Sequence, residues 1–222
     1  MNIGVIRFPG TNNEYETLNA LRSFDKVTAH LIESYEPKMV KKMDGIYVPG
    51  GFSYADCLRA GAIAGKSEIM VEIKEFAKDN KPVFGACNGM QILLEAKLLE
   101  GTLLPNKSTR FICKHQYIKI PDNSSYLSDL SGDILNIPIA HFEGNFWTEG
   151  IDPPVIAYYS SQTGEMDETS NPNGSKNHIA GISNKKGNIV AMMPHPERAA
   201  FPFSQSQDGR KIISKFLEAT KC

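Results

Sequence analysis

The sequence is poor in the features that would point to a secreted, membrane or metal-binding protein. Its 222 residues include four cysteines and no Cys-x-x-Cys pair, so neither a disulfide framework nor a zinc knuckle is expected. No run approaches the roughly 18 apolar residues of a membrane helix, and the start MNIGVIRFPG lacks the pattern of a signal peptide. We therefore expect a cytoplasmic protein with reduced thiols.

An excess of charge of one sign is also missing. The chain has 24 Lys and Arg and 25 Asp and Glu, which leaves a formal net charge of −1. No block of like charges could follow a phosphate backbone or an anionic membrane surface, so we expect neither nucleic acid nor a membrane as a partner. Hydrophobic residues make up 41% of the chain, enough for a sizeable core. With no internal repeat or long linker, this predicts a single domain over residues 1–222.

The first half of the sequence alternates strand-like and helix-like segments. Such βαβα order predicts an α/β fold, namely a three-layer αβα sandwich around a mostly parallel sheet, with chemistry at the carboxyl ends of the strands. Asn12 or Asn13 is expected to cap the first helix, which runs to about Phe24. The predicted strands are 2–8, 27–32, 45–48 and 83–85, and a second helix is predicted over 67–78.

The second half changes character, because strand-like segments follow one another through turns. A hairpin is predicted over 182–193, around the turn 184–187, and 163–177 is polar enough to be a loop. These features predict antiparallel additions to the sheet. Strands are expected at 110–120, 137–147 and 154–160, and a last amphipathic helix at about 208–219.

Cys87 is the first candidate for chemistry, in the stretch VFGACNGMQ. Gly85 and Gly89 stand two residues before and after it, where a sharp strand-to-helix turn needs small residues. The start of the following helix favours the thiolate, which is the reactive form of cysteine. The pattern predicts a nucleophile; the alternative is a buried structural cysteine.

A cysteine nucleophile needs a base, and His195 in MMPHPER is the best candidate among five histidines. If the segment is extended, Glu197 points to the same side two residues later, and the prolines on either side of His195 stiffen the backbone. This predicts a base with its orienting acid; the alternative is a surface turn with a Glu197–Arg198 pair. His141, with Glu143 at the same spacing, is a weaker rival that we interpret as a substrate-pocket or structural residue.

Gly50 and Gly51 follow the strand 45–48 directly. Adjacent glycines let a backbone N–H approach a ligand closely, which suits an oxyanion hole, with the N–H of Asn88 as the second donor. The alternative is an ordinary strand-end turn.

Two other motifs do not predict binding sites. GAIAGKS, at 61–67, has three residues between its glycines, where a phosphate-binding loop has four. It also follows residues that are predicted to form a helix rather than a strand. Cys113 and His115 have no second pair of ligands, so an ordinary strand is favoured there and no metal site is predicted.

Together these motifs resemble the class I (triad) glutamine amidotransferases, a family of flavodoxin-like architecture. Among them, the chain is most similar to the glutaminase subunits of phosphoribosylformylglycinamidine synthases. The similarity departs from the usual family pattern at Ala55 and Cys57, which stand where that pattern has Gly and Tyr. It extends over VIRFPGTN, PGGFSYADCLRAGAIA, FGACNGMQILLEAKLLEG, RFICK, IPIAHFEGNF and NPNGSKNHIAGISNKKGNIVAMMPHPER.

The resemblance implies a glutaminase mechanism. Cys87 attacks the side-chain carboxamide of L-glutamine, and His195, oriented by Glu197, protonates the departing ammonia and then activates water. Gly51 and Asn88 stabilise the oxyanion. Gln91, one helical turn after the nucleophile, is a further candidate, expected to hold the substrate's α-carboxylate or amine. The alternative is a solvated polar position.

The resemblance also implies partners. A large synthetase subunit of the PurL type would use ATP and Mg²⁺ and receive the ammonia, converting formylglycinamide ribonucleotide to formylglycinamidine ribonucleotide in purine biosynthesis. A small bridging subunit of the PurS type would complete the complex, and this chain itself would need no cofactor. The alternatives are a cysteine peptidase or DJ-1-like hydrolase, and a non-enzymatic homologue of the same fold.

Overall fold

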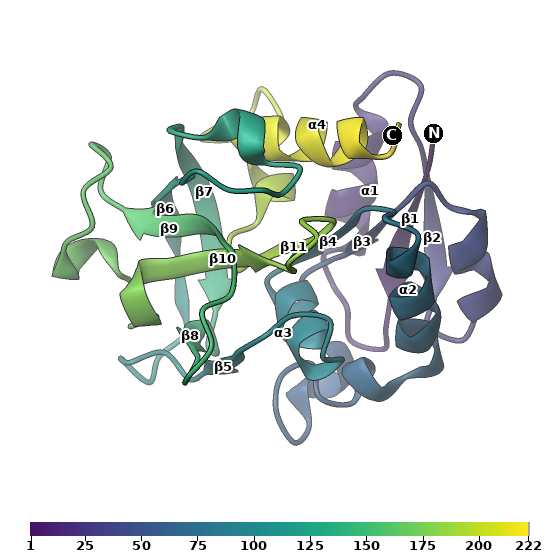
Figure 1. The fold of residues 1–222 in the computed structure, drawn as a ribbon, viewed down its shortest axis with the longest axis horizontal. Helices are drawn as coiled ribbons and strands as arrows, with labels where there is room; N and C mark the ends of the chain where they lie inside the picture. Colours follow the sequence, from purple (N-terminus) through teal and green to yellow (C-terminus); the bar gives the residue numbers. More distant parts are fainter. Residues whose placement is uncertain (222) are drawn as a thin grey trace.

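The computed structural model describes residues 1–221. Within them the main feature is a nine-stranded mixed sheet (Figure 1), in which five adjacent strands run parallel to one another. They confirm the parallel sheet that the βαβα order predicts. In order across the sheet they are β2 (Thr28–Glu33), β1 (Asn2–Arg7), β3 (Gly45–Val48), β4 (Val83–Ala86) and β11 (Ile189–Met192).

The second half of the chain adds antiparallel strands beyond β11, as predicted. The hairpin expected over 182–193 is present as β10 paired with β11. A separate two-stranded ribbon is formed by β5 (Thr102–Leu104) and β8 (Asn145–Trp147). The antiparallel strands of the main sheet continue in the order β10 (Ile179–Ser183), β9 (Val155–Ser160), β6 (Ile112–Lys119) and β7 (Ile134–His141).

Helices cover both faces of the sheet and make the predicted three layers (Figure 1). The helices α1 (Glu14–Arg22) and α4 (Gly209–Ala219) pack on one face, and α2 (Glu68–Lys78) and α3 (Asn88–Glu95) on the other. Each presents an apolar stripe at helical spacing, as the buried side chains of α2 show. These are Ile69, Met70, Ile73, Phe76 and Ala77.

Three local expectations are wrong. The strand expected over 137–147 is broken after β7, because the chain bends at Phe142 and the backbone N–H of Gly144 bonds to Asn106 Oδ1 at 3.1 Å. Asn13 precedes α1 but makes no capping hydrogen bond. The helix expected before residue 61 is replaced, in the described chain, by turns that include the 3-10 segment η2 (Ser53–Asp56).

Candidate active site

Cys87 occupies the turn between β4 and α3, as the glycine pattern predicts. Its φ of 49° and ψ of −108° lie outside the conformations that residues other than glycine readily adopt, which is the kind of strain found at functional sites. The two glycines are required by contact. A Cβ on Gly85 would lie 3.0 Å from the backbone of Gly89, and one on Gly89 would lie 2.0 Å from Val48 O.

His195 is carried to the same place by β11, the neighbour of β4. The backbone N–H of Cys87 donates to Met192 O at 2.8 Å, and three residues later His195 N–H donates to Pro138 O at 2.8 Å. Gly50 leaves room for the imidazole, because a Cβ there would be 2.6 Å from His195 Cε1 and 3.5 Å from Cys87 Cβ. The sheet therefore brings nucleophile, candidate base and the glycine loop together.

Glu197 bonds directly to His195, with 2.6 Å between Oε1 and Nδ1. The segment is not extended, however, because Pro196 starts the 3-10 turn η7 (Pro196–Ala199), whose first position suits the fixed φ of proline. The surface alternative is wrong, since His195 is 2% exposed and Glu197 0%. Arg198 pairs with Glu16 instead.

The two partners stabilise each other's charge. Burial lowers the pKa of His195, but the charges of Cys87 and Glu197 outweigh this and raise the pKa above its ordinary value. Burial likewise raises the pKa of Glu197, and the opposing charge and hydrogen bond of His195 lower it overall. The arrangement thus favours an imidazolium beside a carboxylate.

The second imidazole nitrogen of His195, Nε2, is the one that can exchange a proton with a substrate. His195 Nε2 is buried and has no hydrogen-bond partner among the described residues, since Glu197 takes Nδ1. The Cys87 thiol donates to Ala140 O at a long 3.5 Å. A cavity of about 200 Å³ opens over both groups, and Asn13, Gly51 and Phe111 also line it.

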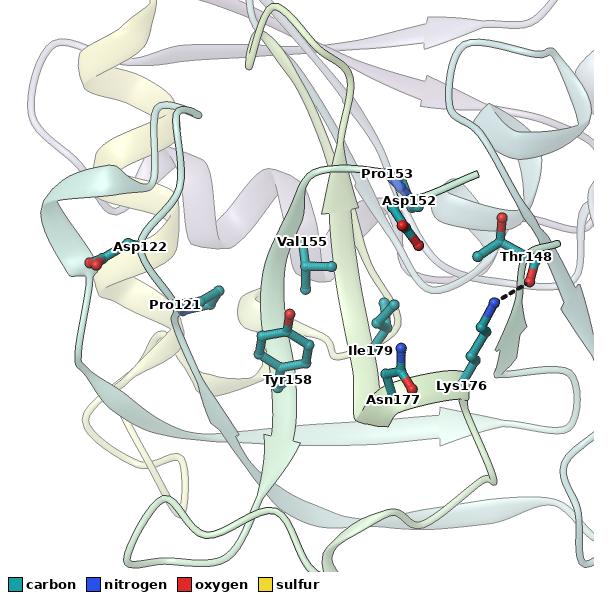
Figure 2. A pocket seen from close by; sticks show the side chains of 10 residues that line it. All are labelled: Pro121, Asp122, Thr148, Asp152, Pro153, Val155, Tyr158, Lys176, Asn177 and Ile179. Carbon is teal, nitrogen blue, oxygen red and sulfur yellow. Dashed lines mark hydrogen bonds between the residues drawn. The ribbon is translucent and has the colours of Figure 1, made fainter. Parts of the chain in front are cut away.

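A larger cavity, of about 310 Å³, lies elsewhere and contains none of the predicted site residues. Figure 2 shows it beside β9 and β10, with Asp152, Tyr158 and Lys176 among its lining side chains. The Nζ of Lys176 donates to Thr148 O at 2.7 Å (Figure 2). We assign the chemistry to the smaller cavity, because only that one holds the strained cysteine and the buried histidine.

Of the candidate oxyanion and substrate residues, only Gly51 lines the cavity over the nucleophile. Gly51 has a φ of 144° and packs against Thr11, while Asn88 accepts from Ser53 N–H at 3.2 Å and donates to Gln91 Oε1 at 2.8 Å. Gln91 is buried and donates to the carbonyl oxygen of Glu143 at 2.7 Å, so it is not a solvated position. Its place at the substrate stays a prediction.

His141 is placed close to the site without the properties of a base. Burial and then the charge of His195 lower the pKa of His141 to about 4. Its Nδ1 bonds to Asn106 Oδ1 at 3.0 Å, and its ring lies over Gly144, which has no Cβ to clash with it. Glu143 is not its partner, because the carboxylate bonds to Ala60 N–H instead.

Two residues that contact Glu197 were not predicted from the sequence. Asn13 Nδ2 donates to Glu197 Oε1 at 2.6 Å, and Tyr47 Oη donates to Glu197 Oε2 at 3.0 Å. The sequence presents Asn13 as a helix cap and Tyr47 as part of an apolar strand, so neither carries a local signal for this role. The failure of Asn13 to cap α1 is explained by the bond it makes here.

The segment 61–67 and the pair of Cys113 and His115 lie in turns and in strand β6, respectively. The segment 61–67 contains turns and the 3-10 segment η3 (Ala64–Lys66), and His115 Nδ1 bonds to Asn136 across β6 and β7 at 3.2 Å. Cys113 lines the smaller cavity.

Among residues 1–221, no group of three or more His, Cys, Asp or Glu side chains is arranged to hold a metal ion. In the same range, no helix combines the length and the apolar character needed to cross a membrane.

Comparison with known protein families agrees with the α/β fold and with the grouping of Cys87, His195 and Glu197. A family model described as a CobB/CobQ-like glutamine amidotransferase domain matches residues 1–218. The class is thus that of the glutamine amidotransferases, enzymes that take nitrogen from glutamine.

More similar proteins point to one member of that class. The chain is 45% identical to the phosphoribosylformylglycinamidine synthase subunit PurQ of Pyrococcus horikoshii, over 98% of this chain and 97% of the relative. It is 42% identical to the subunit of that name from Chlorobaculum parvum, over 98% and 89%. A solved structure of PurLQS from Thermotoga maritima matches with a TM-score of 0.88 and 33% identity, over 98% and 97%. The chain belongs to the PurQ family of glutamine amidotransferases.

Proposed function

We propose that this chain hydrolyses L-glutamine to glutamate and ammonia through Cys87, His195 and Glu197. One observation carries the proposal. The strained Cys87 faces, in a buried site, an imidazole whose far nitrogen is held by a carboxylate 2.6 Å away. This is the arrangement of nucleophile, base and orienting acid that acyl transfer requires.

The chemistry follows in two halves. The Cys87 sulfur attacks the carboxamide carbon of glutamine, and the tetrahedral intermediate collapses to a thioester as His195 gives its proton to the departing ammonia. Water then attacks the thioester carbon, His195 takes a proton from it, and glutamate leaves with the thiol restored. Glu197 keeps the imidazole oriented in both halves.

The oxyanion of each tetrahedral intermediate needs hydrogen-bond donors. We assign these to the backbone N–H groups of Gly51, which lines the cavity, and of Asn88, which follows Cys87 directly. Gly50 leaves room for His195 beside them. Gln91 supports the substrate from the first turn of α3, where it is tied to Asn88.

The ammonia serves a synthetase. The relatives are named as subunits of phosphoribosylformylglycinamidine synthase, and the matching structure is a PurLQS complex. We therefore assign to this chain a large PurL-type partner and a small PurS-type partner. In the assembled enzyme the PurL-type subunit would use ATP and Mg²⁺ to convert formylglycinamide ribonucleotide to formylglycinamidine ribonucleotide. This chain would require no cofactor.

Two further points belong to the proposal. We expect residues 1–222 to form one domain, and the sheet shared by strands from both halves of the described chain supports this. The enzyme works in the cytoplasm, where a reducing environment preserves thiols such as those of Cys57, Cys87 and Cys113, which are all free in the described chain.

The test separates nitrogen donation from synthesis. In the complex assembled with both partner subunits, Cys87→Ala should abolish product formation from glutamine and leave the rate with added ammonium salt unchanged. The cysteine side chain is small, so the variant should fold. Amidine product is measured from both nitrogen sources, with wild-type protein alongside. Loss of the ammonium-dependent rate as well would mean that Cys87 is needed for assembly, and the donor mechanism would be wrong.

A further inference from the structure

Two buried side chains outside the Cys–His–Glu arrangement converge on its carboxylate. We propose that Asn13 and Tyr47 are positioning residues that fix the orientation of Glu197 and moderate its charge, and that they set the basicity of His195 through it. The inference rests on the proposed glutaminase function and deepens it.

Both oxygens of Glu197 are used. Oε1 accepts hydrogen bonds from Nδ1 of His195 and Nδ2 of Asn13, each at 2.6 Å. Oε2 accepts a hydrogen bond from the hydroxyl of Tyr47 at 3.0 Å. Asn13 and Tyr47 are 1% exposed and Glu197 0%, so no solvent can replace a missing donor. A buried carboxylate without such donors would be unfavourable as an anion.

The amide of Asn13 can face the carboxylate in only one way. Arg198 donates to its Oδ1, which leaves the NH₂ group to point at Glu197. Arg198 is itself held by Glu16, with 3.0 Å between Nε and Oε2. Asn13 also forgoes a capping bond to α1, an interaction that contributes about 1 kcal/mol where it forms. A residue that breaks a local rule in this way often serves a site.

Tyr47 is equally well fixed. It lies in β3, next to β4, with its ring 4.9 Å from that of Phe84 and 5.9 Å from that of Phe216. Burial, followed by the charge of Glu197, raises the pKa of Tyr47 well above its ordinary value. The hydroxyl therefore stays protonated and can act as a donor toward the carboxylate.

The consequence concerns His195. Its surroundings include Cys87 from the β4–α3 turn, Glu197 from its own turn and His141 from β7. Two neutral donors disperse the negative charge of Glu197, so removing one strengthens the field of the carboxylate at the imidazole and loosens its position. We expect a higher pKa for His195 and a slower chemical step, with little change in glutamine binding.

The experiment uses two nearly isosteric variants, Tyr47→Phe and Asn13→Leu. The first deletes one hydroxyl, and the second removes the amide donor, while Arg198 keeps its bond to Glu16. Tyr126→Phe is the matched control, because Tyr126 packs on the same Phe216 but donates to Val83 O, away from Glu197. The kcat and KM for glutamine are measured in the assembled complex, and the pKa of His195 by NMR of labelled imidazole in a Cys87→Ala background.

Both variants should lower kcat by roughly ten- to a hundredfold with KM within about twofold, and raise the pKa of His195 by about half a unit or more. The control should change neither. If the two variants match the control in kcat and in pKa, or lose activity only in proportion to lost thermal stability, the positioning role is refuted. The NMR result does not depend on turnover, so a chain without glutaminase activity would refute the proposed function separately.

Discussion

At the scale of single residues, His195 and Glu197 contribute differently to the same buried pair. The imidazole moves protons in both halves of the reaction, whereas the carboxylate orients it and stabilises its charge. His195→Ala should therefore leave a glutaminase rate roughly ten- to a hundredfold lower than Glu197→Gln does. Steady-state kcat/KM of the complex with glutamine measures the difference.

His141→Ala is the control for this comparison, because its imidazole is buried nearby but has a pKa lowered to about 4 and contacts Asn106. It should retain more activity than His195→Ala. A more severe loss for His141→Ala would reassign the base. Equal residual rates for His195→Ala and Glu197→Gln would give Glu197 a role beyond orientation.

At the scale of elements, the turn after Gly51 stores backbone strain. Tyr54, Ala55 and Asp56 have φ values of 53°, 55° and 52°, and this left-handed conformation costs residues with a Cβ roughly 1–2 kcal/mol each. A glycine at position 55 would carry no such cost.

Ala55→Gly should consequently raise the free energy of unfolding by about 0.5–1 kcal/mol, after allowing for the greater freedom of glycine in the unfolded chain. Ala62→Gly is the control, since Ala62 lies in the same region without a positive φ. This substitution should lower the free energy of unfolding. Urea denaturation of both variants gives the two free energies. A loss of stability with Ala55→Gly would contradict the assignment of strain to this residue.

At the scale of the whole molecule, the site opens on a surface rich in exposed apolar side chains. Phe52 and Phe111 line the cavity over Cys87 and stack with 6.5 Å between ring centroids, and Leu58, in the strained turn region, is 93% exposed. Because these groups adjoin the candidate oxyanion loop, docking of the synthetase can set its geometry.

The free chain should therefore hydrolyse glutamine slowly, and adding the PurL-type subunit with its nucleotide and substrate should raise the rate about tenfold or more. Leu58→Asp should weaken this stimulation, whereas Val71→Asp, at an exposed position on α2, should not. Glutamate release with and without the partner is the measurement. A high rate for the free chain that is unchanged on mixing would argue against control by the partner, without affecting the roles of Cys87 and His195.

Several local features of this protein could be predicted from patterns of neighbouring residues. Periodicity and turn chemistry predicted β3 at 45–48, the α/β order of the first half and the hairpin that ends in β11. Gly85 and Gly89 predicted the turn at Cys87, because a sharp strand-to-helix turn allows only small residues at those positions. The pairing of His195 and Glu197 was also predicted, although through an extended segment rather than the turn η7 that brings them together. All of these depend on residues within a few positions of one another.

Which segments become neighbours in space could not be predicted in this way. The pairing of β11 with β4 brings His195 to Cys87 across more than a hundred residues, and no local pattern encodes which strands become neighbours. The same holds for Asn13 and Tyr47, whose bonds to Glu197 join three separate segments. The local sequence indicates a helix cap at Asn13 and a core strand at Tyr47. Asn13 does not cap α1, because the buried carboxylate of Glu197 needs hydrogen-bond donors. Sequence patterns report local preference, whereas a buried site is assembled by long-range packing.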